Sequence, residues 1–89
     1  MAKIDMSMAS PGEGSLSGAA AEALFNLGMM YCVGRKVERD LVAAHKWFNL
    51  AALRGSKEAR TCRVEISQEM STDEIAEAQR QARQWLTLH

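Results

Sequence analysis

The chain has 89 residues, which is enough for one small domain, and its 11 basic and 11 acidic residues give no net charge. Hydrophobic residues make up 47% of it, which favours a packed core over disorder. A zero net charge gives no overall attraction to nucleic acid or to an anionic membrane, and it puts no charge repulsion in the way of self-association.

The N-terminal residues have the composition of a tail. The first 18 residues contain the only proline, half of the six glycines and four serines. We therefore predict a flexible tail over residues 1–18 and a helical domain over residues 19–89. The tail has no apolar stretch long enough for a signal peptide, and the apolar segment 19–33 is too short to cross a membrane. We expect a cytoplasmic protein that does not bind membranes.

Two helices are predicted next. In the first, over residues 19–33, the side chains expected on one face are Ala20, Ala23, Leu27, Met30 and Tyr31. Gly34 suits the end of this helix, and residues 34–37 form a turn. The second helix begins near Glu38 to Asp40, where carboxylates suit the positive end of a helix dipole. It continues to about Arg54, and Gly55 ends it.

The remaining chain predicts a second pair of helices. Ser56 is the expected N-cap of a helix over residues 57–70. Ser71 and Glu74 then have the spacing of a capping box, which places the start of a fourth helix that runs to about Leu86. Because the connections are short, neighbouring helices are expected to be antiparallel. The sequence thus predicts an all-α fold of four helices in two hairpins.

Parts of the two predicted hairpins repeat each other. The segment Ala21-Glu22-Ala23 recurs as Lys57-Glu58-Ala59 at an offset of 36 residues, and Ala44-x-x-Trp47 recurs as Ala82-x-x-Trp85 at an offset of 38. Both offsets are close to the length of a two-helix repeat unit.

Residues 21–55 resemble the Sel1-like repeat (SLR), a relative of the tetratricopeptide repeat. The resemblance is carried by Ala23, Leu27, Gly28, Tyr31, Gly34, Asp40, Ala44, Trp47, Ala51 and Gly55. It departs at Lys36, where the family usually has a second glycine, so either the turn is altered or Lys36 adopts an unfavourable φ. The resemblance implies a short, right-handed, tetratricopeptide-like solenoid, with a first repeat over 20–55 and a degenerate closing repeat over 56–88. It also implies a non-enzymatic, protein-binding module.

The small residues of this pattern have a mechanical role. Gly28 and the alanines at positions 23, 44, 51 and 52 are expected to let the first two helices approach closely. Tyr31 and Trp47 are then expected to fill the space at the ends of that contact. A larger side chain at Gly28 would push the helices apart.

The first predicted helix is apolar on a second side as well. Beyond its core face it carries Leu24, Phe25, Met29 and Val33, where a helix of a single hairpin should be polar. Three explanations remain open: cover by the tail through Ile4, Met6 and Met8, packing against a second copy, or binding of a different protein. We predict a protein or peptide partner, with a homodimer as the alternative. The candidate protein-binding residues are Glu22, Phe25, Asn26, Met29 and Val33.

Other functions find little support in the sequence. Arg60, Arg63, Arg80 and Arg83 alternate with glutamates, so we expect a solvated face with pairs such as Glu77–Arg80, and nucleic-acid binding is only a distant third alternative. His45 lies beside the core stripe without converging ligands, so no metal site is predicted. No nucleophile–base pair or phosphate-binding loop is present, so we expect neither catalysis nor a cofactor. Cys32 and Cys62 are expected to be free, partly buried thiols.

Overall fold

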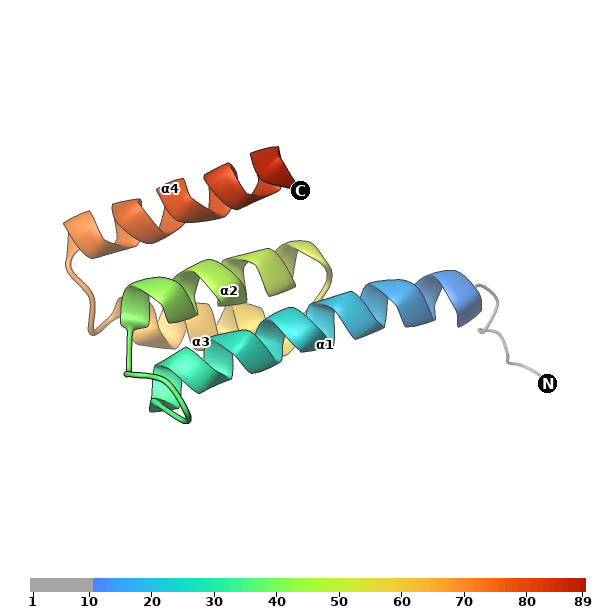
Figure 1. Ribbon diagram of the computed structural model, residues 1–89, viewed down its shortest axis with the longest axis horizontal. Coiled ribbons are helices and arrows are strands. Elements are labelled where there is room, and N and C mark those ends of the chain that lie inside the picture. Colours follow the sequence, from blue (N-terminus) through green and yellow to red (C-terminus); the bar gives the residue numbers. More distant parts are fainter. Residues whose placement is uncertain (1–10) are drawn as a thin grey trace.

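The protein is a bundle of four α-helices. The computed structural model describes residues 11–89, with side chains described from Gly18 onward. Its helices are α1 (Pro11–Val33), α2 (Leu41–Leu53), α3 (Lys57–Ser67) and α4 (Thr72–Leu88). Successive helices run in opposite directions (Figure 1). The predicted all-α class and its four helices are confirmed, and none of the described residues forms a strand.

Helix α2 is the centre of the bundle. It contacts each of the other three helices, whereas α1 and α3 meet over only a few residues. The buried side chains of α2 are accordingly Ala44, His45, Phe48, Leu50 and Ala51. Helix α4 rests on α2, on the side away from α1 (Figure 1). The limited contact between α1 and α3 leaves a seam between these two helices.

Side-chain caps fix where three of the helices begin. The Asp40 carboxylate accepts a hydrogen bond from the backbone N–H of Ala43, and Ser56 caps α3 in the same way. At α4, Ser71 and Glu74 form the complete capping box that their spacing predicts. Each cap satisfies backbone N–H groups that have no partner within their own helix. The predicted starts of α3 and α4 are therefore confirmed.

Two helix boundaries differ from the prediction. Helix α1 begins at Pro11, whereas we expected it near Ala19. Proline suits a first helical turn, because it lacks only an N–H that would have no helical partner there. Of the expected flexible tail, residues 1–10 lie outside the described residues. Helix α3 ends at Ser67 and not at Met70, because residues 68–70 form the turn into α4.

The α1–α2 turn uses positive φ angles at two positions. Gly34 has φ 77° and Lys36 has φ 68°. Lys36 thus keeps the left-handed conformation that a glycine would adopt more easily. The turn is held by a hydrogen bond from the Asp40 N–H to the Tyr31 carbonyl, at 2.9 Å. The Arg39 side chain also donates to the Cys32 carbonyl, at 2.8 Å. The second of the two expectations for Lys36 is confirmed.

Candidate functional site

The contact between α1 and α2 is centred on Gly28 and Phe48. A Cβ atom on Gly28 would lie 2.5 Å from Cδ1 and Cε1 of Phe48, so only glycine leaves room for this ring. Phe48 is completely buried, with 0% of its surface exposed. The close approach predicted at Gly28 is therefore present. The aromatic ring that fills it belongs to Phe48, however, and not to Trp47 as we predicted.

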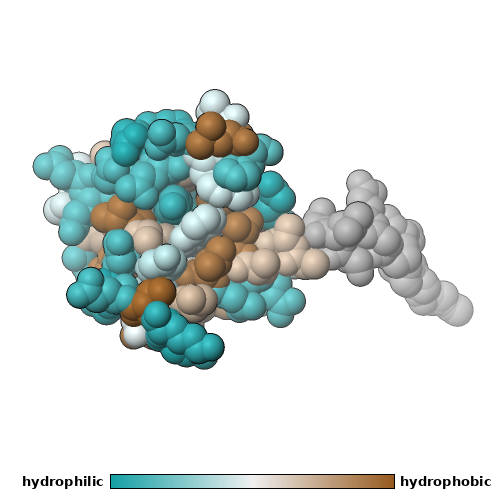
Figure 2. Space-filling view, viewed as in Figure 1, coloured by the Kyte–Doolittle hydropathy of each residue, from teal (hydrophilic) through white to brown (hydrophobic). Residues whose placement is uncertain are grey.

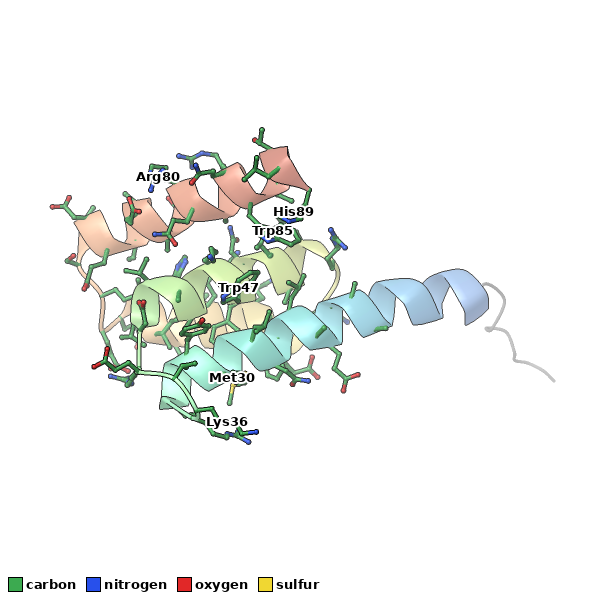
Figure 3. All side chains as sticks on the ribbon, in the orientation of Figure 1. Met30, Lys36, Trp47, Arg80, Trp85 and His89 are labelled. Atoms are coloured by element: carbon green, nitrogen blue, oxygen red, sulfur yellow. The ribbon has the colours of Figure 1, made fainter. Side chains whose placement is uncertain are left out.

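Trp47 joins α2 to α4 instead. Its ring meets that of Trp85 edge to face, with centroids 5.9 Å apart (Figure 3). On the α2 side, the Lys46 ammonium lies 4.3 Å from the centre of the Trp47 ring. A band of apolar and weakly polar residues covers α2 between α1 and α4 (Figure 2). Trp47 therefore helps to hold α4 on α2.

The core face of α1 is rotated from the predicted one. Ala21 and Leu24 are buried next to Gly28, whereas Ala23 is exposed. Met30, which we also expected in the core, lies on the side of α1 away from α2 (Figure 3). The spacing 21, 24, 28 directs one stripe at α2, and the Gly28–Phe48 contact fixes which stripe it is. Of the other motif residues, Ala44 and Ala51 are fully buried and Leu27 and Tyr31 partly so.

The five predicted binding residues of α1 fall into two groups. Glu22, Asn26 and Val33 are exposed, Val33 to 55%. Phe25 and Met29 are half-buried and pack against the core. The Phe25 ring lies 5.7 Å from that of Phe48. The expectation that this side of α1 lacks a covering neighbour is thus wrong for Phe25 and Met29, and also for Leu24, which is only 8% exposed.

Glu22 and Phe25 also line a pocket at one end of the seam between α1 and α3. The pocket has a volume of about 430 Å³. Its wall is formed by Gly18, Ala21, Glu22, Phe25, Gly55, Ser56 and Glu58. Gly18, Ala21, Ser56 and Glu58 were not predicted as site residues, and Gly55 was predicted only as a motif residue. Periodicity along one helix does not show which turn of another helix lies beside it.

A second pocket, of about 490 Å³, lies beside the α1–α2 turn and has several acidic residues in its wall. Apart from Glu38, these acidic residues already use their side chains within the fold. Arg39 donates to Glu69 at 3.3 Å, Asp40 caps α2, and Glu74 belongs to the capping box of α4. Its polar groups therefore maintain the turn and the ends of the helices.

His45 is a core residue, although we expected it beside the core. It is 3% exposed, and its Nε2 atom lies 3.1 Å from the Ser67 hydroxyl. That hydroxyl donates to the Arg63 carbonyl at 2.7 Å, so Nε2–H must be the donor to Ser67. Nδ1 has no hydrogen-bond partner among the described residues. Burial, and next the charge of Arg63, lower the pKa of His45.

The other charged side chains and thiols singled out in the sequence either form surface ion pairs or lie partly buried. Glu77 and Arg80 form the predicted ion pair at 2.6 Å, and hydrogen bonds from Arg80 and Gln81 lower the pKa of Glu77 to about 2. Cys32 and Cys62 are free, half-buried thiols, as predicted. Burial raises the pKa of Cys62, so its thiol stays protonated near neutral pH. Within residues 11–89, no three potential metal ligands are grouped together.

The hairpin, its turn and its glycine contact define a helical repeat protein. Residues 21–56 match the Sel1 repeat, and this match supports a Sel1-like helical repeat architecture. No curated protein and no solved structure shows a significant match to the chain. Repeats of this family generally mediate protein–protein interactions and are typically non-catalytic. No helix in the described part of the chain combines the length and apolar character that a membrane span requires.

Proposed function

We propose that this protein is a small adaptor that binds another protein through the outer side of α1. We call this surface the α1 face and define it by Glu22, Phe25, Asn26, Met29 and Val33. The observation that carries the proposal is the pocket beside Glu22 and Phe25, which opens on this face at the contact with α3. Ligand sites are concave and combine apolar walls with a few polar groups, as this pocket does.

The two groups of residues on the α1 face have complementary roles. Phe25 and Met29 are held from behind by the core, so they offer a preorganised apolar surface to a partner. Preorganisation lowers the entropy lost on binding. Glu22, Asn26 and Val33 are exposed and surround them. An apolar centre with a polar rim is the usual anatomy of a protein interface.

The structure also decides which variants test the proposal. Charged substitutions at Phe25 or Met29 would damage the core, so the informative positions are exposed. Peptides selected from a random display library on the immobilised protein supply the ligands. We expect the variant Asn26→Arg/Val33→Asp to weaken their binding at least about tenfold, because it places new charges beside the apolar centre of the α1 face. Fluorescence anisotropy measures the affinity, and circular dichroism checks the fold.

Val64 provides a matched control. It is 53% exposed, against 55% for Val33, and lies on α3. It does not line the pocket. Val64→Asp therefore makes the same chemical change at a similar exposure and should leave peptide affinity unchanged. If every selected peptide binds Asn26→Arg/Val33→Asp as tightly as the original protein, the α1 face is not the binding surface.

A further inference from the structure

We infer that the pocket between α1 and α3 receives a lysine or arginine side chain from a separate partner protein, with an apolar residue next to it on the partner. This inference rests on the proposed function, because it names the chemistry of the partner that the α1 face binds. It depends on the shape of the pocket and on the charge of its wall.

The apolar part of the pocket is rigid and open. The Phe25 ring forms one wall and is braced by Phe48, which is itself fixed against Gly28. Small residues provide the space: a Cβ atom at Gly18 or at Gly55 would meet nothing within 4 Å. A volume of about 430 Å³ holds one long side chain and part of a neighbour. The methylene stem of a lysine or arginine fits along an aromatic wall of this kind.

The polar part of the pocket is acidic, and its two carboxylates are free to bind a cation. Glu22 comes from α1 and Glu58 from α3, so two carboxylates from different helices line one cavity. Neither carboxylate makes a hydrogen bond or an ion pair with any of the described residues. Among the described side chains, from Gly18 onward, no basic one lines the pocket to neutralise them. Charge complementarity therefore selects a cation, such as a guanidinium or an ammonium group.

The other acidic pocket, beside the α1–α2 turn, shows why it matters that a carboxylate has no partner within the protein. There the carboxylates of Asp40, Glu69 and Glu74 are bonded to the α2 cap, to Arg39 and to the α4 cap. A cation entering that pocket would compete with bonds that hold the fold. In the pocket of Glu22 and Glu58 a cation would break no hydrogen bond or ion pair of these two carboxylates among the described residues.

The test uses the full chain, labelled with ¹⁵N, and two tripeptides. One is acetyl-Leu-Arg-Leu-amide. The other replaces arginine with citrulline, which has nearly the same shape but no charge. We expect the arginine peptide to shift the amide signals of Gly55 and Ser56 in a saturable way, and the citrulline peptide to bind at least about tenfold more weakly. Equal shifts with both peptides, or no shift with the arginine peptide up to its solubility limit, would overturn the inference.

Two sets of variants locate the binding site. Gly18→Leu should abolish binding by filling the pocket, whereas Gly18→Ala removes the glycine but leaves the pocket open and should bind normally. Glu22→Gln/Glu58→Gln should bind at least about fivefold more weakly. The control Glu38→Gln/Asp73→Asn removes two charges outside the pocket and should change nothing. Undiminished binding by Gly18→Leu contradicts the inference.

The same spectra separate the other possible occupants. If the pocket signals move with protein concentration alone, a second copy fills the pocket. If they move when residues 1–10 are deleted, the N-terminal segment fills it. Either result overturns the inference. If the selected peptides of the display experiment need Asn26 and Val33 but no basic residue, the proposed function stands and only this inference fails.

Discussion

At the scale of single residues, His45 couples the stability of the fold to pH. The ring titrates near pH 6.5 in an unfolded chain, and burial lowers its pKa in the folded protein. As the pH falls below 6.5, the unfolded state takes up a proton that the folded state resists, so the free energy of unfolding falls. The decrease ends once the pH passes below the folded-state pKa. A protonated Nδ1 would carry an N–H with no acceptor among the described residues.

We therefore predict lower stability in mild acid. Between about pH 7.5 and pH 5.5, the contribution of His45 to the free energy of unfolding should fall by at most about 1.4 kcal/mol. Urea denaturation at the two pH values measures it. His45→Leu should remove most of this pH dependence, because it keeps an apolar side chain where the ring was. Glu77 does not interfere, since its pKa of about 2 lies far below this range. An unchanged pH dependence in His45→Leu would assign the effect to another group.

Single residues also show how far the sequence predicts the structure. The caps at Ser56 and Ser71 are predicted correctly, because a cap depends on residues within one turn of each other. The burial of His45 is missed, because it depends on Ser67 from another helix. The position of Ala23 on the core face is predicted wrongly for a similar reason. Helix α1 has apolar residues on more than one side, so its sequence alone does not reveal which side meets α2.

At the scale of elements, the α1–α2 hairpin depends on the missing side chain of Gly28. We predict that Gly28→Ala destabilises the protein, because the new Cβ atom would lie 2.5 Å from two atoms of the buried Phe48 ring. Overpacking of this kind costs about 1–3 kcal/mol, against which alanine recovers up to about 1 kcal/mol of helix propensity. We expect a net loss of about 1–2 kcal/mol in urea denaturation.

Gly18 is the matched control for this prediction, because it lies in the same helix and its Cβ position is open. Gly18→Ala should stabilise the protein by up to about 1 kcal/mol. In the Phe48→Leu background, Gly28→Ala should cost less than in the original protein, because the smaller side chain leaves room for the added methyl group. Equal stability of Gly28→Ala and Gly18→Ala would mean that the Phe48 ring moves aside at no cost in free energy of unfolding.

At the scale of the whole molecule, α2 forms the common core for α1, α3 and α4. The sequence predicts four helices and their order, because periodicity and turn residues are local signals. It does not predict that α4 rests on α2 through Trp47 and Trp85, since that contact joins residues far apart in the chain. The pocket between α1 and α3 is missed for the same reason. Glu22 and Phe25 are predicted binding residues from the sequence, but the pocket wall that they share is completed by Gly18 and Ala21 of α1, by a turn and by α3.

The same arrangement bears on the alternative of a homo-oligomer joined through α1. That alternative needs a large apolar surface, because a stable dimer buries about 800 Å² per partner and its core is largely apolar. Leu24, Phe25 and Met29 already pack within the bundle. Among the described residues of α1, Val33 is the one large hydrophobic side chain that is mostly exposed. The other such residues, Leu53, Val64, Leu86 and Leu88, are spread over the remaining helices.

We therefore predict a monomer of 9.8 kDa at micromolar concentration, measured by light scattering on a size-exclusion column. The zero net charge gives no electrostatic barrier to association, so a monomer would directly reflect the small apolar area left on α1. A mass twice as large would contradict the prediction. Val33→Asp and Leu88→Asp would then locate the interface, because the first places a charge on α1 and the second on α4. Only a dimer that Val33→Asp dissociates would restore the homo-oligomer joined through α1.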